Sequence, residues 1–436
     1  MAKRTISPGG TIDGAVELPG DKSISHRYAI LAALAEGASE ISNYASAADC
    51  HSTLECFRQM GIEIEEKEAR VRIGGKGLHG LSKPRRMLDA ENSGSTMRML
   101  AGVLAGQPFS STLTGDESLR RRPMRRVIEP LRQMGAKIRC QDGDRAPLEI
   151  QGGNLRGIDY TPPTPSAQVK SAILLAGLFA DRPSTVRESV CTRDHTEIAL
   201  REFGATIDSI DGTRGSVRIQ PGPKLTARKL NVPGDLSTAV FLIGAALILP
   251  ESSLMLRSVG LNPTRARVLD FFISIGAPVH VASIQSRDGE LAGDVSVRHA
   301  PMKGGKIAGT HVAEMIDELP MLAALGPFAE EGIEIHDAAE LRVKESDRIA
   351  ALAEGLRQMG ARVEEFPDGL RVEGRAAGKL HGAKIDPHGD HRIAMALSVA
   401  ALGAEGDTII RDAECVGVSF PEFFATLDRL RGGDAS

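Results

Sequence analysis

The sequence predicts an α/β fold of two domains, each made of three copies of one repeating unit. Three recurring features support this: a six-residue motif, here called the glycine phrase, that ends a helix at a glycine; a second helix rich in small residues; and a short β-branched strand between the two helices. The glycine phrase is clearest at 131–136 and 356–361, which share the letters LRQMGA. It returns about every 72 residues, so six units fill nearly the whole chain and indicate a repeat architecture.

Each copy of the glycine phrase predicts the end of a helix followed by a strand. Apolar and charged residues run at helical spacing and stop at a glycine, which commonly closes a helix in the left-handed conformation. An alternating strand follows, as in 62–64 or 136–138. The glycines that close the six copies are Gly61, Gly135, Gly204, Gly276, Gly360 and, in a degenerate form, Gly432.

The helix upstream of each glycine phrase is rich in Ala, Leu and Gly and is expected to be buried. A β-branched strand such as 184–186 usually follows, so the unit reads strand–helix–strand–helix–strand–strand. Three such units would form one compact body with helices inside and sheets outside, and a domain boundary is expected near 225–232. The expected buried helices span 23–36, 93–105, 167–180, 236–249, 319–329 and 391–402.

Composition and charge exclude several functional classes. The net charge of −4 gives no global field that favours nucleic acid or membranes, and scarce aromatic residues without Trp argue against base-stacking platforms. The five cysteines show no CxxC spacing, so we expect reduced thiols. The first residues show no signal sequence and no apolar run reaches the length of a membrane span, which predicts a cytoplasmic protein.

Unusual polar residues cluster where the expected buried helices begin. Helix N-termini carry unpaired N–H groups and partial positive charge, so they are ready anion sites. Ordinary capping is the alternative, and we favour it for Asp235 and Ser237. Capping does not explain Lys22, Arg27 and Arg392, because cations oppose the helix dipole and need an internal carboxylate or an anionic ligand. The segments are 21–27, 92–96, 165–170, 234–237, 317–320 and 389–392.

The second helices of the units are expected to begin with further charge. Most arginines of 118–126 are expected to form a solvated basic face, and Arg122 is singled out because it precedes a helix-starting proline. Lys344 and Arg348 are four residues apart and so would share one helical face, with Glu345 on the adjoining face. A surface salt-bridge lattice explains that segment equally well. A third such helix is expected to open at 191–195.

Several arginines and lysines with two or three carboxylates suit a substrate that carries phosphate and carboxylate groups. Other chemistries fit less well, because the chain has neither a GxxxxGK(S/T) phosphate loop nor a GxSxG elbow. His388 and His391 are weak evidence for a metal, since a third ligand is missing. We therefore expect no cofactor and no metal, with arginines carrying the charge of a phosphate-handling reaction.

Taken in order, these motifs resemble the 5-enolpyruvylshikimate-3-phosphate synthase family, the 3-phosphoshikimate 1-carboxyvinyltransferases. The resemblance is carried over the whole chain by 21–27, 92–98, 122–123, 166–168, 342–348 and 390–392. It implies a monomer with the two-domain inside-out α/β barrel typical of enolpyruvyl transferases, with six βαβαββ repeats, three per domain. It places the first domain at 21–228, the second at 1–20 plus 229–436, and the active-site cleft between them.

The resemblance also implies a reaction and the residues that perform it. The 5-hydroxyl of 3-phosphoshikimate attacks C2 of phosphoenolpyruvate while the methylene carbon is protonated, and the tetrahedral adduct loses phosphate, in the shikimate pathway to chorismate and aromatic amino acids. By position, Asp317 would be the base, Glu345 the proton donor and Lys22 a bridge between the substrates. Contacts to 3-phosphoshikimate are implied for Lys22, Ser23, Arg27, Ser166, Gln168, Asp317 and Lys344. Contacts to phosphoenolpyruvate are implied for Lys22, Gly94, Arg122, Gln168, Arg348 and Arg392.

The chain departs from the family pattern at two positions. Ala167 stands where some members have a second serine, and Val418 stands where many have a lysine that contacts phosphoenolpyruvate. The segments 166–171 and 192–197 instead resemble a divergent bacterial branch of the family, in which Arg193 would add a phosphate contact.

Two alternatives stay open at this point. The sister enolpyruvyl transferases that act on UDP-N-acetylglucosamine commonly use a cysteine just before the Arg-Pro pair, and here no cysteine lies between Cys56 and Cys140. A non-catalytic or RNA-end-processing protein built from the same repeats is suggested by the arginines of 120–126. Near-neutral charge and scarce aromatic residues oppose it, whereas strong salt-dependent RNA binding would support it.

Overall fold

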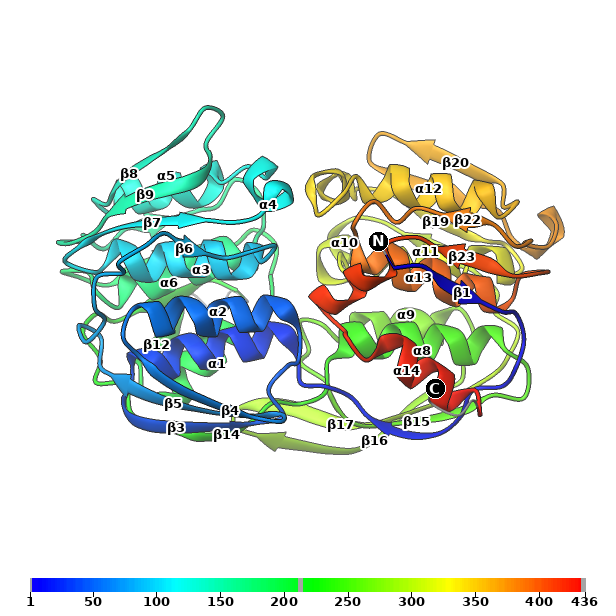
Figure 1. The fold of residues 1–436 in the computed structure, drawn as a ribbon, viewed down its shortest axis with the longest axis horizontal. Coiled ribbons are helices and arrows are strands. Elements are labelled where there is room, and N and C mark those ends of the chain that lie inside the picture. Colours follow the sequence, from blue (N-terminus) through cyan, green and yellow to red (C-terminus); the bar gives the residue numbers. More distant parts are fainter. Residues whose placement is uncertain (1, 211–214, 433–436) are drawn as a thin grey trace. The chain divides into compact units, whose positions relative to one another are not determined.

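The computed structural model describes residues 2–210 and 215–432 and divides into two compact units (Figure 1). Met1, 211–214 and 433–436 fall within the predicted domain ranges but lie outside the described residues. We call Gly20–Val232 with Arg287–Glu290 the central unit. The terminal unit comprises Met1–Pro19, Pro233–Ser286 and Leu291–Ser436.

The central unit contains three four-stranded sheets of one design. In each sheet the first two strands are parallel, and an antiparallel hairpin completes it. This is the predicted βαβαββ order. The sheets, in spatial order, are β14 (Lys229–Asn231), β3 (Glu36–Ser42), β5 (Arg70–Lys76) and β4 (Glu63–Lys67); β6 (Leu88–Asp89), β7 (Ser110–Thr114), β9 (Arg145–Gln151) and β8 (Lys137–Gln141); and β10 (Asp159–Tyr160), β11 (Ser184–Val186), β13 (Val217–Ile219) and β12 (Ile207–Ser209).

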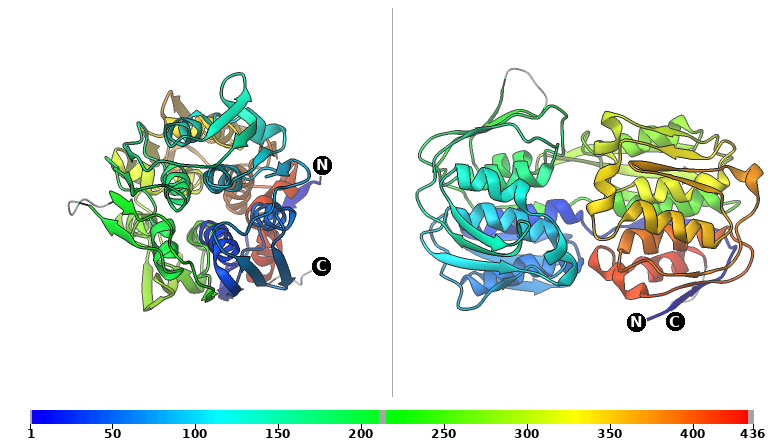
Figure 2. Two further views of the ribbon diagram at one scale, coloured as in Figure 1. Left: turned by 90° about the vertical axis from the view of Figure 1, so that its left-hand side faces the viewer. Right: turned by 90° about the horizontal axis from the view of Figure 1, so that it is seen from above.

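The helices of the central unit lie inside its sheets, as the left view of Figure 2 shows. The buried set is α1 (Lys22–Leu34), α3 (Gly94–Ala105) and α6 (Ala167–Gly177). A Cβ at Gly102 of α3 would lie 2.3 Å from the carbonyl oxygen of Ala172 on α6, so the close approach of these helices requires glycine. The remaining helices are α2 (Ala48–Gln59), α4 (Glu117–Arg121), α5 (Arg125–Gln133) and α7 (His195–Glu202).

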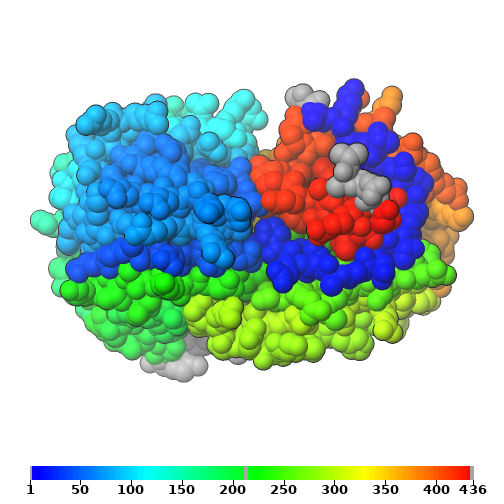
Figure 3. Space-filling view, turned by 60° about the horizontal axis from the view of Figure 1, so that its bottom comes forward, coloured from blue at the N-terminus to red at the C-terminus, as the bar shows by residue number. Residues whose placement is uncertain are grey.

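The terminal unit repeats the design with one modification. Its third sheet has three strands, and β1 from the chain start pairs antiparallel to β23 where the other sheets have a hairpin. Figure 3 shows these N-terminal residues beside the C-terminal segment. The sheets are β16 (Val279–Arg287), β17 (Glu290–Arg298), β15 (Ser253–Gly260) and β2 (Asp13–Glu17); β18 (Gly305–Ile307), β19 (Ile333–Ile335), β21 (Gly369–Val372) and β20 (Val363–Phe366); and β1 (Arg4–Ile6), β23 (Thr408–Ile410) and β22 (Lys384–Ile385).

The buried helices of the terminal unit again bring small residues together. They are α8 (Leu236–Ile248), α11 (Leu319–Ala324) and α13 (His391–Leu402). The expected helix 319–329 is shorter than predicted, because α11 ends at Ala324 and a 3-10 turn, η1 (Gly326–Phe328), follows it. The other helices are α9 (Arg267–Ser274), α10 (Thr310–Glu314), α12 (Arg348–Gln358) and α14 (Phe423–Leu430), with 3-10 turns η2 (Ala339–Val343), η3 (Arg375–Ala377) and η4 (Ala413–Val418).

Two strands exchange places between the repeats. Strand β2 precedes α1 in sequence but pairs in parallel with β15, and β14 precedes α8 but pairs in parallel with β3. The pairing of Lys229 with Glu40 therefore places 229–232 in the central unit, so the boundary lies after Val232 rather than after 228. The N-terminal segment of the terminal unit ends at Pro19 rather than at 20.

Two helix starts differ from the predictions. Lys344 and Arg348 do not share a helical face, because α12 begins only at Arg348, where Asp347 caps it by accepting from the Ala350 N–H at 3.1 Å. Lys344 instead follows η2 in extended backbone. Pro123 likewise does not start a helix, since α4 ends at Arg121 and α5 begins at Arg125.

Candidate active site

The buried helices of the central unit begin with side-chain caps. Asp21, Ser93 and Ser166 accept from backbone N–H groups of the first turns of α1, α3 and α6. Ser166 accepts from Val169 at 3.4 Å, so the predicted substrate residue also caps its helix. Capping therefore accounts for part of this polar pattern, as the alternative interpretation held.

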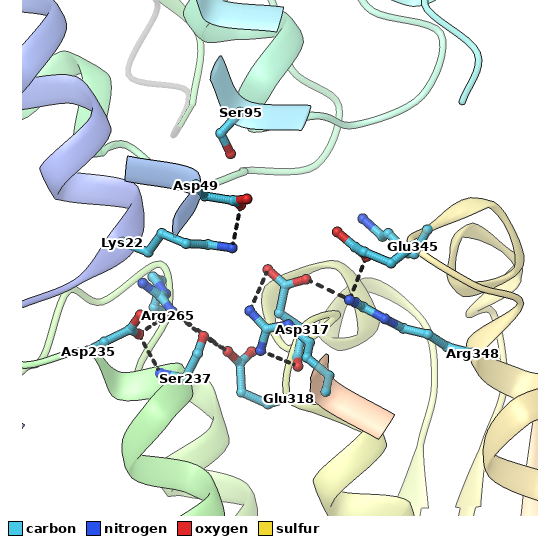
Figure 4. A network of polar contacts seen from close by, with 12 residues as sticks. Lys22, Asp49, Ser95, Asp235, Ser237, Arg265, Asp317, Glu318, Glu345 and Arg348 are labelled. Carbon is cyan, nitrogen blue, oxygen red and sulfur yellow. Dashed lines mark hydrogen bonds and ion pairs between the residues drawn. The ribbon is translucent and has the colours of Figure 1, made fainter. Parts of the chain in front are cut away.

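Lys22 is the first residue of α1, and its charge has an internal partner. Its Nζ lies 2.9 Å from Asp49 Oδ2 on α2, a contact visible in Figure 4. Asp49 was not among the predicted site residues, although it is an acidic residue in the first turn of a helix. The Asp49 carboxylate therefore offsets the unfavourable charge of the ammonium group at the N-terminus of α1.

Arg27 lies on α1 and is 5% exposed. Its Nε donates to Thr196 Oγ1 at 2.6 Å, and its two terminal nitrogens donate to the Ser23 carbonyl and the Ser171 hydroxyl. Burial lowers the pKa of Arg27 to about 10, against the opposing effect of Glu197. Because its hydrogen-bond partners are neutral, the charge of Arg27 remains available to an anion.

Gly94 and Gln168 belong to one cluster with two arginines. Arg98 donates to Gln168 Oε1 at 2.6 Å, and Gln168 Nε2 donates to Ser95 Oγ at 3.0 Å. A Cβ at Gly94 would lie 2.6 Å from Arg98 Nη1 and 3.4 Å from Arg122 Nη1. Glycine at 94 therefore gives two guanidinium groups access to the start of α3, which suits a small anion.

Buried polar groups connect α6 to the first turn of α7, and the predicted site residues did not include them. Lys170 is fully buried and lies 2.7 Å from Glu188 and 2.8 Å from Glu197. Burial opposes the charge of Lys170, but Glu197 and Glu188 outweigh it and raise its pKa. His195 lies 2.6 Å from Glu290 of the same unit. The segment 192–197, which carries Arg193, is therefore tied to the buried helices.

In the terminal unit, Arg348 is the centre of the predicted site. It is 1% exposed, and its Nε donates to Asp390 Oδ2 at 2.8 Å. Its Nη2 donates to Glu345 Oε2 at 2.6 Å, and its Nη1 lies 3.6 Å from Asp317 Oδ1 (Figure 4). Burial opposes its charge, but Asp390, Glu345 and Asp317 outweigh burial and raise the pKa of Arg348. One guanidinium thus holds both predicted catalytic carboxylates.

Arg392 and Lys344 complete this group. Arg392 donates to the Asp317 carbonyl at 2.8 Å and lies 3.9 Å from Asp317 Oδ2. Burial lowers the pKa of Lys344, with Asp317 and Glu340 opposing the shift. The predicted residues Asp317, Lys344, Glu345, Arg348 and Arg392 are therefore brought together within one unit. Lys22, Ser23, Arg27, Gly94, Arg122, Ser166 and Gln168 lie in the other unit.

A second polar cluster lies beside Asp317. Asp235 caps α8 by accepting from the Ser237 N–H at 2.8 Å, as predicted. The Ser237 hydroxyl, predicted to cap, instead donates to Glu318 Oε1 and accepts from Arg265. Nothing in the sequence pattern linked Arg265 to these residues.

The arginines of 118–126 are mostly surface groups. Arg121 pairs with Glu117, and Arg125 donates to Glu129 at 3.0 Å, so the prediction of a solvated face holds for them. Arg122 is 6% exposed and donates to Asn92 Oδ1 at 2.7 Å. Its burial and partners set it apart from the surface arginines.

Residues 2–210 and 215–432 contain no group of three or more His, Cys, Asp or Glu arranged to hold a metal ion, and no helix there has the length and apolar character to cross a bilayer. The five cysteines are all free thiols. The arginines around Asp317 and Glu345 can bind anions, and these two carboxylates can move protons.

Comparison with known proteins identifies one family over nearly the whole chain. The family model for EPSP synthase (3-phosphoshikimate 1-carboxyvinyltransferase) matches residues 6–427. The 3-phosphoshikimate 1-carboxyvinyltransferase of Solibacter usitatus is 54% identical over 99% of this chain and 100% of its own length, and that of Koribacter versatilis is 52% identical over 99% of each.

Solved structures give the same result. EPSP synthase from Acinetobacter baumannii is 39% identical, covers 98% of both chains and superposes with a TM-score of 0.86. The enolpyruvyl transferase NikO from Streptomyces tendae is 20% identical with a TM-score of 0.80, covers 99% of this chain and 97% of its own, and shares the fold. The chain belongs to the EPSP synthase family, that of the 3-phosphoshikimate 1-carboxyvinyltransferases.

Proposed function

We propose that the chain transfers the enolpyruvyl group of phosphoenolpyruvate to the 5-hydroxyl of 3-phosphoshikimate and releases phosphate. The observation that carries this proposal is the Arg348 group, in which one buried guanidinium holds Asp317 and Glu345. Two carboxylates beside fixed cations supply both the proton transfers and the charge stabilisation that the reaction needs.

In the first step Asp317 removes the proton of the 5-hydroxyl as its oxygen bonds to C2 of phosphoenolpyruvate. Glu345 gives a proton to the methylene carbon, which becomes a methyl group in the tetrahedral adduct. In the second step the C2–O bond to phosphate breaks and the leaving phosphate takes the proton held by Asp317, while the methyl group returns a proton to Glu345 and becomes the product's vinyl group. Atoms and charges balance without a redox partner.

Phosphoenolpyruvate would bind where Arg348 and Arg392 now hold carboxylates. An anion that takes over Nη2 of Arg348 displaces Glu345, which accepts that N–H at 2.6 Å. A carboxyl group freed from an arginine and placed near a bound anion holds its proton more tightly, which suits a proton donor. The substrate thereby prepares Glu345 for its role.

The central unit supplies the remaining contacts. Arg122 with Gly94 suits phosphoenolpyruvate, because a small residue leaves room between guanidinium groups. Ser23, Arg27, Ser166 and Gln168, with Lys344 of the terminal unit, are the proposed contacts to 3-phosphoshikimate, and Lys22 is placed between the two substrates. The proposal therefore draws the substrate contacts from residues of both units.

We further propose that the protein acts as a monomer in the cytoplasm. The free thiols support a reducing compartment, since disulfides are rare there. Sedimentation velocity at micromolar concentration tests the monomer: one species near 46.3 kDa is expected, and a stable larger species would contradict it.

The function is tested by phosphate release from phosphoenolpyruvate in the presence of EDTA. Parallel reactions contain 3-phosphoshikimate or UDP-N-acetylglucosamine as acceptor. Release only with 3-phosphoshikimate is the expected result. Release only with the nucleotide sugar would mean that UDP-N-acetylglucosamine, and not 3-phosphoshikimate, is the acceptor. No release in either reaction would favour a non-catalytic protein.

A further inference from the structure

A buried ionic cluster of the terminal unit has no part in the reaction steps above. Its members, which we call the Glu318 cluster, are Asp235, Ser237, Arg265 and Glu318, and they are 7%, 4%, 4% and 2% exposed. Ser237 donates to Glu318, and the Arg265 guanidinium donates to Ser237 (Figure 4). Arg265 Nη2 also lies 3.4 Å from Asp235 Oδ1 and 3.6 Å from Glu318 Oε1.

The Glu318 cluster joins three segments that are distant in sequence. Asp235 and Ser237 open α8, Arg265 precedes α9, and Glu318 stands at the N-cap position of α11. Unlike α8, helix α11 has no side-chain cap hydrogen bond. The Glu318 side chain instead contacts Ser237 at the start of α8 and Arg265, and so connects the start of α11 to both.

Asp317 is thereby held on both sides. Its own carbonyl accepts from Arg392 at 2.8 Å, and the next residue, Glu318, is anchored in the cluster. The Asp317 carboxylate itself has longer contacts, 3.6 Å to Arg348 and 3.9 Å to Arg392. The bond to the Asp317 carbonyl and the anchoring of Glu318 therefore fix the backbone from which this carboxylate projects.

Stability alone does not explain the Glu318 cluster. Removing charges from water costs several kcal/mol per ion, and well-packed apolar residues usually stabilise a protein as well as a buried ion pair does. Hydrogen bonds depend on direction and can therefore hold a side chain in one orientation, which apolar contacts do not do. A catalytic carboxylate needs such fixing, since an error of about 1 Å costs roughly a hundredfold in rate.

We propose that Ser237, Arg265 and Glu318 are positioning residues that hold Asp317 in its reactive orientation. The proposal rests on the proposed function, because it takes Asp317 as the base. The cluster is joined to Asp317 through the backbone at Glu318, the next residue, so its loss should affect the chemical step rather than substrate binding. The residues act through Asp317 and not on the substrates.

The test measures kcat and KM for Glu318→Gln, Ser237→Ala and Arg265→Lys. We expect kcat to fall about tenfold to a hundredfold, with both KM values within about threefold of wild type. Ser252→Ala is the matched control, because Ser252 Oγ accepts from the buried Ile12 N–H at 2.9 Å beyond the far end of α8. It removes a buried hydroxyl of the same unit and should leave kcat unchanged.

Double variants separate positioning from general damage. If Glu318 acts through Asp317, adding Glu318→Gln to Asp317→Ala causes no further loss of kcat. Near wild-type kcat in folded Glu318→Gln, or an equal loss in both backgrounds, would overturn the proposal. Near wild-type kcat in Asp317→Ala alone would overturn the assignment of the base, a failure distinct from that of the cluster. Thermal unfolding of every variant establishes that it is folded.

Discussion

Arg348 shows at the residue scale how one buried cation can hold two reacting groups. A guanidinium offers donors in several directions, so Asp390, Glu345 and Asp317 can share it. Asp390 is fully buried and stays with Arg348, whereas Glu345 and Asp317 are partly exposed and can meet a substrate. The division between structural and reacting carboxylates therefore follows their exposure.

The first prediction concerns the two reacting carboxylates. Asp317→Ala and Glu345→Ala should each lower kcat at least about a hundredfold, because a general base or acid contributes roughly 10²- to 10⁴-fold. The fold should persist, since Asp390 still pairs with the buried Arg348. Steady-state kinetics with circular dichroism checks both points.

Glu334→Ala provides the comparison for these two variants. Glu334 is a carboxylate of the same unit that pairs with Lys306 at 2.9 Å outside the predicted site. It should keep wild-type turnover. Equal turnover rates in all three variants would contradict the catalytic roles assigned to Asp317 and Glu345.

The second prediction concerns pH and His26. Burial, with Lys22 and Arg27, lowers the pKa of His26 well below 6.5, and its Nδ1 lies 2.7 Å from Thr53 Oγ1. Because the unfolded chain binds a proton below pH 6.5 and the folded chain does not, His26 stabilises above that pH and loses this contribution as the pH falls.

Urea unfolding of wild type and His26→Gln from pH 7.5 to 5.5 measures this effect. The variant should be less stable at pH 7.5, and the difference should shrink by up to about 1.4 kcal/mol per pH unit below 6.5. A difference that stays constant over this range would mean that the pKa of His26 is not lowered in the folded protein.

At the scale of elements, the sequence predicted the helices and strands that depend on neighbouring residues. The small-residue helices were predicted because Ala and Gly suit close packing, and the structure confirms them. The prediction that 342–348 is helical was wrong, because the Asp347 side chain caps α12 and the helix begins only at Arg348. The partner of Ser237 could not be predicted, because Glu318 is 81 residues away in sequence.

The third prediction compares glycines in two buried helices. Gly102→Ala should destabilise the protein by roughly 1–3 kcal/mol, because the new Cβ would lie 2.3 Å from a backbone oxygen and force α3 from α6. Gly244→Ala in α8 meets only the end of the Met321 side chain, at 2.8 Å, which can move. Thermal unfolding should show a smaller loss for Gly244→Ala, and equal losses would contradict this account of the packing.

At the scale of the whole molecule, the repeats were visible in the sequence but the pairing of their first strands was not. The exchange of β2 and β14 does not change the strand count of the two sheets that it joins, so no pattern within one repeat reveals it. The same limit applies to the site. Arginines and carboxylates at helix starts could be predicted, whereas Asp49, Arg265 and Glu290 depend on tertiary contacts.

The enolpyruvyl transfer itself is tested most directly by running the reaction of phosphoenolpyruvate with 3-phosphoshikimate in D2O. The product is then analysed by mass spectrometry. Protonation of the methylene carbon followed by its reversal predicts solvent deuterium in the vinyl group of the product. Product without deuterium would contradict the role of a proton donor such as Glu345, and no enolpyruvyl product at all would contradict the proposed function.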